Sequence, residues 1–434
     1  MRSHLVAPAV AVGGLRLAGM GLGLLVTILI GRWLGPAALG VYGYSVIVLS
    51  LVAVPVSYGW AALLLRRVAA AVHDRGWGEA KGLFIRGTQF AAALAAVAGL
   101  LGLGGVALFP EVLPMAIGPG VVALLAAVLF LDQISALRMA FLRGLGHPVL
   151  GQLPETLVRP TLIVAGFCAL ALAAAMHPNL LQAFIAMAVA AALSALLGAA
   201  VLWRTLPQDV ARAAPTFHVR DWSAAAGALT VNSGLMLLNS YADILMLGAL
   251  GSLHDVGVYR VAGQIALLSG FVYTALNMIA APRFAYLRAA GDRVALARTA
   301  ALAARLAFLG TLPLPIVFWL FGPAILEAVF GPAFVAARAP MFVLFAAQAV
   351  NAAAGMASSL IIASGRERTL ARFTLAAVVV NVAVSLSLIP RWGAMGAATA
   401  NLAAGIAWNA SMWIFARRAI GVDTSIVGSG AGLP

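Results

Sequence analysis

The chain has 434 residues, of which 63% are hydrophobic and only 9% carry charge, and its mean hydropathy is +1.04. Soluble domains carry charge on roughly a quarter of their residues, so this composition excludes a soluble protein and predicts an integral membrane protein. A net charge of +14 could indicate nucleic-acid binding. The basic residues, however, gather on one side of the predicted membrane, which excludes nucleic acid as a partner and makes that side cytoplasmic.

Only four basic residues lie near the other side: Arg32, Arg260, Arg338 and Arg391. The single cysteine, Cys168, excludes a disulfide framework and a cysteine-based metal cluster. At the N-terminus the apolar run resumes after Arg16 and continues to Ile30, which predicts an uncleaved membrane helix instead of a signal peptide.

The first half of the chain contains apolar runs that are long enough to cross a bilayer core of roughly 30 Å. We predict helices at 8–31, 38–65, 83–109, 121–142 and 152–175, and a sixth that ends near Trp203. Residues 32–37 form an outer turn and residues 66–81 an inner loop. The polar segment around Pro207 and Pro215 then predicts a cytoplasmic linker at 205–221, between domains 1–204 and 222–434.

The second half repeats this pattern. We predict helices at 222–250, 256–281, 299–321, 339–363, 370–389 and 394–416. Pro313 and Pro315 should bend the third of them. An inner loop holds arginines from Arg283 to Arg298, and an outer loop is expected at 322–337. With six helices in each half, both termini are predicted to be cytoplasmic.

A short repeat relates the two halves. Gly40-Val41-Tyr42 recurs as Gly257-Val258-Tyr259 at an offset of 217 residues, which is half the chain length. Even numbers of helices make such a repeat parallel, with an axis along the membrane normal. The predicted fold class is therefore an all-α integral membrane protein, with about twelve transmembrane helices in two six-helix bundles.

Polar residues inside the predicted spans are candidate functional groups, because they are costly in lipid. Asn232, Asn239 and Asp243 lie seven and four residues apart, which places them on one face of a helix. This face either lines a cavity or makes hydrogen bonds to neighbouring helices.

Arg16 lies inside the first helix, where an unpaired cation costs several kcal/mol. It either binds an anionic ligand or pairs with a carboxylate such as Asp243 or Asp132. Glu155 and Arg159 lie four residues apart and are predicted to pair with each other.

Arg260 follows the central turn and either reaches the outer headgroups or binds the same ligand. No catalytic signature accompanies these residues: the one lysine, Lys81, is not part of a nucleotide-binding loop, and there is no HExxH, G-x-S-x-G or Cys/His cluster. We therefore expect a protein that is not an enzyme.

Several motifs together resemble the O-antigen-type flippases, the polysaccharide-transport branch of the multidrug/oligosaccharidyl-lipid/polysaccharide exporter superfamily. They are Arg32-Trp-Leu-Gly-Pro-Ala-Ala-Leu-Gly-Val-Tyr, Asp243 through Ala262, Phe330-Gly-Pro-Ala-Phe, Ala363-Ser-Gly-Arg and Ile389-Pro-Arg-Trp-Gly-Ala-Met-Gly-Ala-Ala. The similar lipid II flippases carry more arginines on the first two helices, whereas here the first helix has only Arg16 before Arg32.

The resemblance implies a transporter of the bacterial inner membrane that moves undecaprenyl-pyrophosphate-linked oligosaccharide from the inner to the outer leaflet by alternating access, for surface polysaccharide biosynthesis. Arg16 and Arg260 are then candidates for the pyrophosphate, and Asn232 and Asn239 for the glycan. Its partners would be the lipid-linked oligosaccharide, the bilayer and other polysaccharide assembly proteins.

Two alternatives remain open. In an ion-coupled multidrug exporter of the same superfamily, Asp243 and Asp132 would be the ion-coupling groups. A membrane-embedded glycosyltransferase or polymerase would present a long outer loop with carboxylates, and the outer loops here are short, with few acids. We expect no bound cofactor or metal, with H⁺ or Na⁺ as candidate coupling ions.

Overall fold

The computed structural model describes residues 3–108, 118–174 and 179–428, and within them no β-strand occurs. Side chains of residues 3–10, 171–174 and 232 are also outside the description. By contact the chain divides into two compact units, one of Met1–Leu34 with Ser45–Gly234 and the other of Gly35–Tyr44 with Leu235–Pro434. Each unit is described by itself below.

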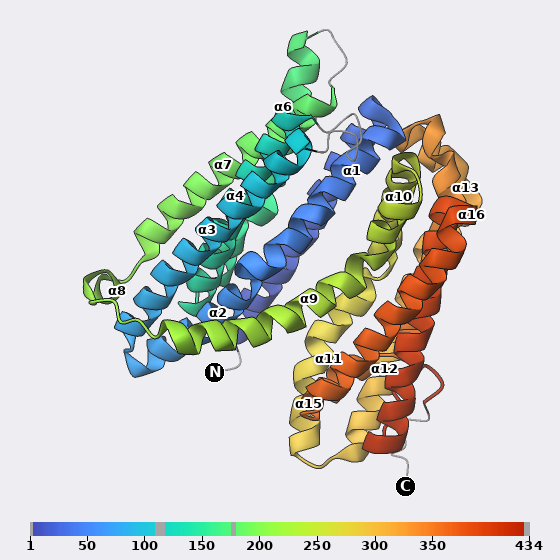
Figure 1. Cartoon of the computed structure of the whole chain (residues 1–434). Coiled ribbons are helices and arrows are strands. Elements are labelled where there is room, and N and C mark those ends of the chain that lie inside the picture. Colours follow the sequence, from blue (N-terminus) through green and yellow to red (C-terminus); the bar gives the residue numbers. More distant parts are fainter. Residues whose placement is uncertain (1–2, 109–117, 175–178, 429–434) are drawn as a thin grey trace. The chain divides into compact units, whose positions relative to one another are not determined.

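The first unit contains the helices of the first half of the chain (Figure 1). They are α1 (Ser3–Ala53, apart from Gly35–Tyr44, which belongs to the second unit), α2 (Gly59–Asp74), α3 (Trp77–Leu108), α4 (Pro119–Gly144), α5 (Pro148–Leu153), α6 (Arg159–Ala174), α7 (Leu180–Thr205), α8 (Gln208–Arg212) and the first part of α9 (Val219–Leu250). Helices α3, α4 and α7 run side by side, and α2 packs on α4. The core is formed by large apolar side chains such as Trp60, Phe141 and Trp222.

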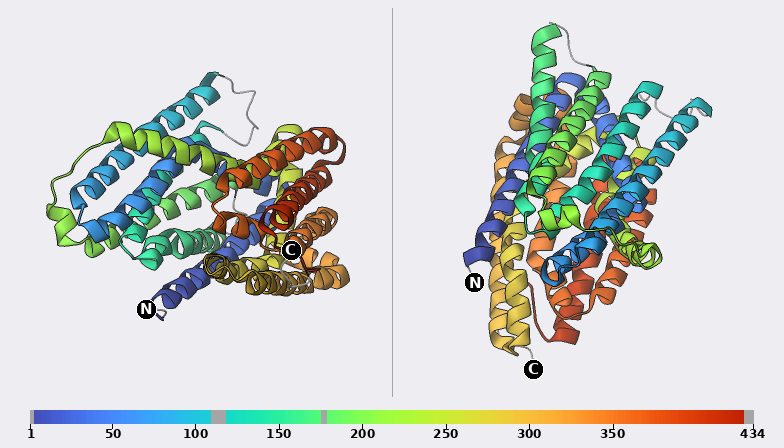
Figure 2. Two further views of the ribbon diagram at one scale, coloured as in Figure 1. Left: turned by 90° about the horizontal axis from the view of Figure 1, so that it is seen from below. Right: turned by 90° about the vertical axis from the view of Figure 1, so that its left-hand side faces the viewer.

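The second unit contains the rest of α9 and the helices that follow it. They are α10 (Leu253–Ser269), α11 (Phe271–Ala289), α12 (Arg293–Thr311), α13 (Pro313–Phe330), α14 (Arg338–Ala354), α15 (Ala357–Ala363) and α16 (Glu367–Phe415). A 3₁₀ turn covers Pro332–Ala337 and a π turn Ala416–Ile420. Figure 2 shows α11 and α12 as an antiparallel pair, and α14 packs on α16.

Two very long helices each represent two membrane crossings. The apolar stretch Ala11–Asp74 has 64 residues and Glu367–Ile420 has 54, whereas about 20 residues cross a bilayer. Gly35 (φ 80°, ψ 178°) interrupts the first and Gly393 (φ 50°, ψ −126°) the second, both with non-helical backbone angles. With the bent α10–α11 pair counted as one span, the described residues contain ten candidate spans. Dividing each of the two long helices at its glycine gives the predicted twelve.

The breaks between helices differ in detail from those predicted. The outer turn expected at 32–37 is a single break at Gly35. The inner loop expected at 66–81 is wrong, because α2 continues to Asp74 and only Arg75 (φ 56°) and Gly76 separate it from α3. Arginine side chains at a membrane surface can reach the water while their backbone stays helical, so charge alone does not end a helix.

Similar differences occur in the second half. The inner arginine loop is helical apart from residues 290–292, and the outer loop expected at 322–337 is mostly the end of α13. The helix is interrupted where the prediction placed a bend, because α12 ends at Thr311 and α13 begins at Pro313. The outer loop after Phe109 and the turn at Met176 lie outside the described residues.

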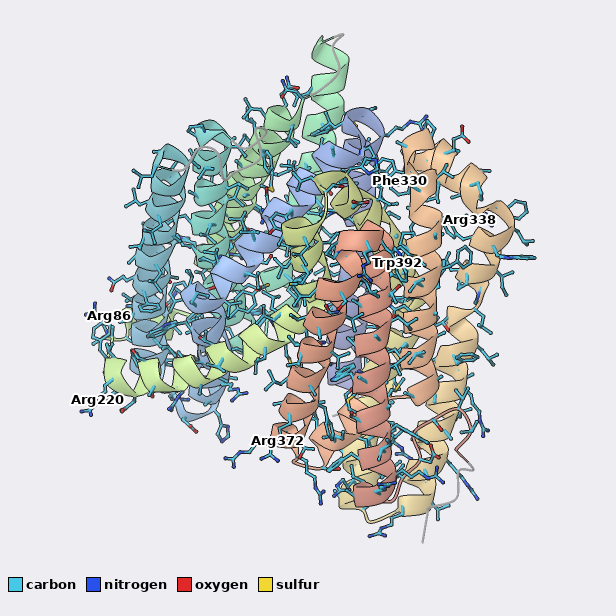
Figure 3. The ribbon with its side chains drawn as sticks, turned by 45° about the vertical axis from the view of Figure 1, so that its right-hand side comes forward. Arg86, Arg220, Phe330, Arg338, Arg372 and Trp392 are labelled. Atoms are coloured by element: carbon cyan, nitrogen blue, oxygen red, sulfur yellow. The ribbon has the colours of Figure 1, made fainter. Side chains whose placement is uncertain are left out.

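Charged residues gather at the ends of each unit. In the first unit, Arg86 and Arg220 lie at the same end (Figure 3). In the second, Arg372 lies at the end opposite to Arg338, and these two were assigned to the inner and outer sides from the sequence. Within each unit this placement fits the predicted sidedness.

The predicted linker packs on the first unit. Lys81 Nζ donates hydrogen bonds to the carbonyl oxygens of Ala211 and Ala213, at 2.6 and 3.0 Å. Thr216 N donates to Gly78 O at 3.0 Å, and a Cβ on Gly82 would lie 1.9 Å from Thr216 O. The division by contact therefore falls not in this segment but at Gly234, inside α9.

The segment after α16 fills a gap left by a broken helix in the second unit. Helix α14 ends at Ala354, and Gly355 (φ 75°) separates it from α15. Ile426 N donates to Ala353 O at 3.0 Å and Thr424 Oγ1 to Ala354 O at 2.8 Å. Helix ends leave carbonyl groups without intrahelical partners, so residues 422–428, the C-terminal strap, act as the cap of α14.

The strap is also held by charged groups. Arg305 donates to Ile426 O at 3.0 Å and to Gly428 O at 2.9 Å. Asp423 Oδ1 accepts hydrogen bonds from Trp413 Nε1 and from Ser425 N and Oγ. Partial burial by itself would raise the pKa of Asp423, but these hydrogen bonds, together with the charge of Arg417, outweigh it and hold the pKa below its ordinary value.

This arrangement predicts a weak acid sensitivity of the strap. A carboxylate with a lowered pKa stabilises the folded form above its unfolded pKa, and the contribution disappears as the pH falls through the folded value. Because Asp423 is partly exposed, we expect at most about 1 kcal/mol. The protection of the amides of 422–428 against hydrogen exchange, relative to the intrinsic exchange rate at each pH, should therefore fall below the ordinary carboxyl range. In Asp423→Asn the exchange should lack this pH dependence, and an unchanged profile in that variant would contradict the assignment.

Candidate substrate- and ion-binding residues

Two π turns shape the polar part of the first unit. They cover Val54–Tyr58 and Pro154–Val158, and each has a proline within its first two residues. Proline lacks an N–H group and disturbs the hydrogen bonds of the preceding turn, which favours a π bulge. Such bulges are frequent at functional sites. Both turns contact polar side chains of α4.

Helix α4 supplies the side chains that face these turns. Ser57 Oγ, in the first π turn, donates a hydrogen bond to Gln133 Oε1, and both side chains are buried. At the second π turn, Arg138 Nη2 donates to Glu155 Oε1 at 2.5 Å. Arg138 also lies against α7, where its Nη1 is 3.4 Å from Gly198 O.

Four charged residues thus form two ion pairs between α4 and the chain around the second π turn. Arg138 pairs with Glu155, and Arg159 Nη1 lies 2.5 Å from Asp132 Oδ1. The predicted pair Glu155–Arg159 is wrong. Residues four apart stack only in a regular α-helix, and the π turn from Pro154 to Val158 separates these two by a wider turn.

The two pairs differ in their accessibility. The side chain of Arg138 is 4% exposed, and its Nε, like Glu155 Oε2, is buried without a partner within the described residues. The side chains of Arg159 and Asp132 are 19% and 35% exposed. The first pair is therefore enclosed at its arginine, although the side chain of Glu155 is 20% exposed, and the second pair is exposed at both residues.

Arg16 lies on α1, close to the second π turn. Its side chain is exposed and makes neither an ion pair nor a hydrogen bond with any described residue. One helical turn further on, a Cβ on Gly19 would lie 2.6 Å from Thr156 Cγ2 and 2.9 Å from Thr156 O. Neither acid that the sequence offered as its partner pairs with Arg16, because Asp132 pairs with Arg159 and Asp243 has other partners.

Asp243 is the centre of a neutral hydrogen-bond cluster in the second unit. It lies on α9, is 5% exposed, and accepts a hydrogen bond from Tyr259 Oη on α10. Asn401 Nδ2 on α16 donates to the same carboxylate at 2.9 Å, and Ile244 N donates to Oδ1 at 2.9 Å. Within the described residues no cation pairs with it, in contrast to Asp132 and Glu155.

The repeated Gly-Val-Tyr segments pack against each other in the second unit. A Cβ on Gly40 would lie 1.7 Å from Leu253 O, and one on Gly257 would lie 1.9 Å from Pro36 O. Pro36 and Leu253 are themselves related by the offset of 217 residues. The contact is therefore reciprocal, which is what a duplicated chain predicts, and it requires glycine because the two backbones nearly touch.

Arg260 lies at the next position of this repeat, opposite Gly43. A Cβ on Gly43 would lie 2.6 Å from Arg260 Cδ and 2.8 Å from its Nη1, so the missing side chain makes room for the arginine. Arg260 Nε is buried and has no partner within the described residues. Contact with the outer headgroups and a role in binding both stay predictions for this arginine.

The two candidate asparagines are less well defined. Asn239 is half-buried on α9, one turn before Asp243, and its amide makes no hydrogen bond with a described residue. The side chain of Asn232 lies outside the described part of the structure. Sequence reasoning missed Arg138, Glu155, Tyr259 and Asn401 as site residues. Pro154, a proline inside an apolar span, is a signal for the π turn that carries Glu155, but the sequence does not indicate its partner.

The family of the chain is shown by its sequence. The sequence profile of a family described as polysaccharide biosynthesis protein matches residues 9–287, which is more than half of the chain. The chain belongs to this polysaccharide biosynthesis protein family. A comparison with curated proteins finds no match.

Solved structures confirm the fold of this polysaccharide biosynthesis protein. It is similar to an inward-facing multidrug resistance MATE family transporter of the MOP superfamily, with a TM-score of 0.76, 16% identity, and coverage of 94% of this chain and 98% of the other. The lipid II flippase MurJ in an inward closed conformation gives a TM-score of 0.68 at 12% identity, covering 95% and 87%. A MOP superfamily transporter from Pyrococcus furiosus gives 0.64 at 14% identity, covering 95% of both chains.

Proposed function

We propose that the protein moves an undecaprenyl-diphosphate-linked oligosaccharide from the inner to the outer leaflet by alternating access. The observation that carries this proposal is Arg16, an arginine that lies inside an apolar helix of a polysaccharide biosynthesis protein and pairs with none of the described residues. An unpaired cation in a membrane span is costly, so it should face water or an anionic ligand. A diphosphate supplies such an anion, and the lipid tail can stay in the bilayer.

The direct test is the leaflet distribution of the lipid-linked oligosaccharide in cells with and without the protein. A membrane-impermeant reagent that modifies the glycan would label only the outer leaflet. Build-up in the inner leaflet on depletion, relieved by the wild-type chain, is the expected result. An unchanged distribution would refute the flippase proposal.

Arg16→Ala is expected to lower this transport about tenfold or more, because a charge-assisted hydrogen bond contributes about 1.5–3 kcal/mol. Arg16→Lys keeps the charge but loses the bidentate geometry of the guanidinium group, so its transport rate should lie between those of the wild type and Arg16→Ala. Arg204→Ala is a matched control, since Arg204 is an exposed arginine in the last turn of α7. Full transport by Arg16→Ala at normal expression would exclude Arg16 as a diphosphate ligand.

The second candidate function is ion-coupled export, and Asp243 favours it. This buried carboxylate has only neutral donors around it, from Tyr259, Asn401 and the backbone. A negative charge with no cation beside it is expensive inside a membrane, so the group should bind a proton or a sodium ion in part of the transport cycle. The same group could couple the flippase to an ion gradient.

Asp243→Asn is therefore expected to transport without dependence on pH or sodium. Initial rates in membrane vesicles with imposed gradients would measure this. Tyr259→Phe is the control, because it removes one hydrogen bond but keeps the carboxyl group, and it should retain the ion dependence. An Asp243→Asn protein that responds to the gradients as the wild type does would exclude Asp243 as the coupling group.

A further inference from the structure

The half-open ion pair Arg159–Asp132 differs from the other charged groups of the first unit. Only one guanidinium nitrogen of Arg159 is used in the pair, and the side chain stays 19% exposed. An arginine has five N–H donors. No nitrogen of Arg159 is among the described side-chain atoms that are buried without a hydrogen-bond partner. Arg159 therefore keeps donors that can reach a ligand, whereas Arg138 is enclosed by Glu155 and α7.

The backbone places Arg159 near Arg16. Helix α1 touches the second π turn where Gly19 meets Thr156. Arg16 lies three residues before Gly19 and Arg159 three residues after Thr156. The first and fifth spans run in the same direction, so the two arginines are offset by about 9 Å along the helices, at 1.5 Å per residue. Both have long, flexible side chains.

We propose that Arg159 is a second diphosphate-binding residue next to Arg16, and that Asp132 is the counter-ion which Arg159 exchanges for the diphosphate. This inference rests on the proposed flippase function. In the empty protein, Asp132 neutralises Arg159 in the membrane. When the ligand arrives, one anion replaces another, so Arg159 never stays uncompensated in a medium of low polarity.

The exchange uses the exposed side of the pair. Asp132 is more exposed than its partner, at 35%. Glu155 cannot be displaced from Arg138 in the same way, because Arg138 is closed off by Gly198, where a Cβ would lie 2.3 Å from Arg138 Cζ. The two pairs thus have different functions: the enclosed pair holds α4 on the π turn, and the open pair offers a cation.

Three variants of the full-length purified protein test this: Arg159→Gln, Asp132→Asn and the double variant. The probe is a water-soluble short-chain prenyl diphosphate, compared with the matching monophosphate. Because Asp132 competes with the ligand, Asp132→Asn should bind the diphosphate several-fold more tightly than the wild type. Arg159→Gln and the double variant should both bind it roughly tenfold more weakly.

A purely structural ion pair predicts the opposite pattern. Each single variant would then leave one charge without its partner, so both would lose thermal stability and binding together, and the double variant would recover. Weaker binding by Asp132→Asn, or wild-type binding by the double variant, would overturn the inference. If the wild type itself neither binds the probe nor transports the lipid-linked oligosaccharide, the proposed function fails instead.

Discussion

Replacing Gly257 by alanine is expected to abolish accumulation of the folded protein, and Gly40→Ala is expected to do the same. The added Cβ would lie 1.9 Å from Pro36 O in the first case and 1.7 Å from Leu253 O in the second. The obstacles are backbone atoms, which no rotamer change can move. The loss should therefore exceed the roughly 1–3 kcal/mol that is typical of overpacking. Monodisperse protein recovered from membranes, by fluorescence-detected size exclusion, would measure it.

Gly263→Ala is the matched control, because it lies on the same helix α10 and its Cβ would only meet Leu344 Cδ1 at 3.9 Å. We expect it to accumulate as the wild type does. Normal accumulation of both Gly40→Ala and Gly257→Ala would mean that the two repeated segments do not cross as closely as described.

The crossing also explains why the duplication could be predicted from the sequence. Gly-Val-Tyr recurs at half the chain length because both copies meet at a backbone contact that only glycine permits. The helix number was predictable for a similar reason, since the length of an apolar run is set by the thickness of the bilayer. The breaks at Gly35 and Gly393 were predictable too, because at each place a short segment with a glycine separates two apolar runs.

The ion pairs could not be predicted in this way. Glu155 and Arg159 have the spacing of a helical pair, and only the π turn at Pro154–Val158 separates them. Their true partners, Arg138 and Asp132, come from another helix, and an apolar sequence contains no signal for the rotation that brings them together. Arg138 looked like one more inner-side cation because the sequence does not reveal that it is buried.

The strap shows a further limit. Residues 422–428 follow the last membrane helix and have no periodicity, yet Thr424 is fully buried and caps α14. It reaches the carbonyl group of Ala354 only because α14 ends there, before Gly355. A prediction of one continuous helix at 339–363 gives this carbonyl group a partner within the helix and so conceals its bond to the strap. Tertiary contacts of this kind depend on a local irregularity that itself has to be known first.

The enclosed ion pair leads to the second large effect. Arg138→Met is expected to destabilise the protein by about 3–5 kcal/mol, because it leaves the carboxylate of Glu155, whose Oε2 is buried, without a cation. Arg138 is itself buried and contacts both the second π turn and α7, so the loss should be seen in the whole first unit. The free energy of unfolding in mixed detergent micelles would measure it.

The double variant Arg138→Met/Glu155→Gln separates the charge from the packing. Replacing both members of a buried pair is often nearly neutral, so the second substitution should recover most of the stability that the first removes. Arg159→Gln serves as the comparison, because both members of its pair are partly exposed, and it should cost clearly less than Arg138→Met. If the double variant is as unstable as Arg138→Met alone, then the arginine stabilises the unit through its contact with Gly198 and α7, and not by neutralising Glu155.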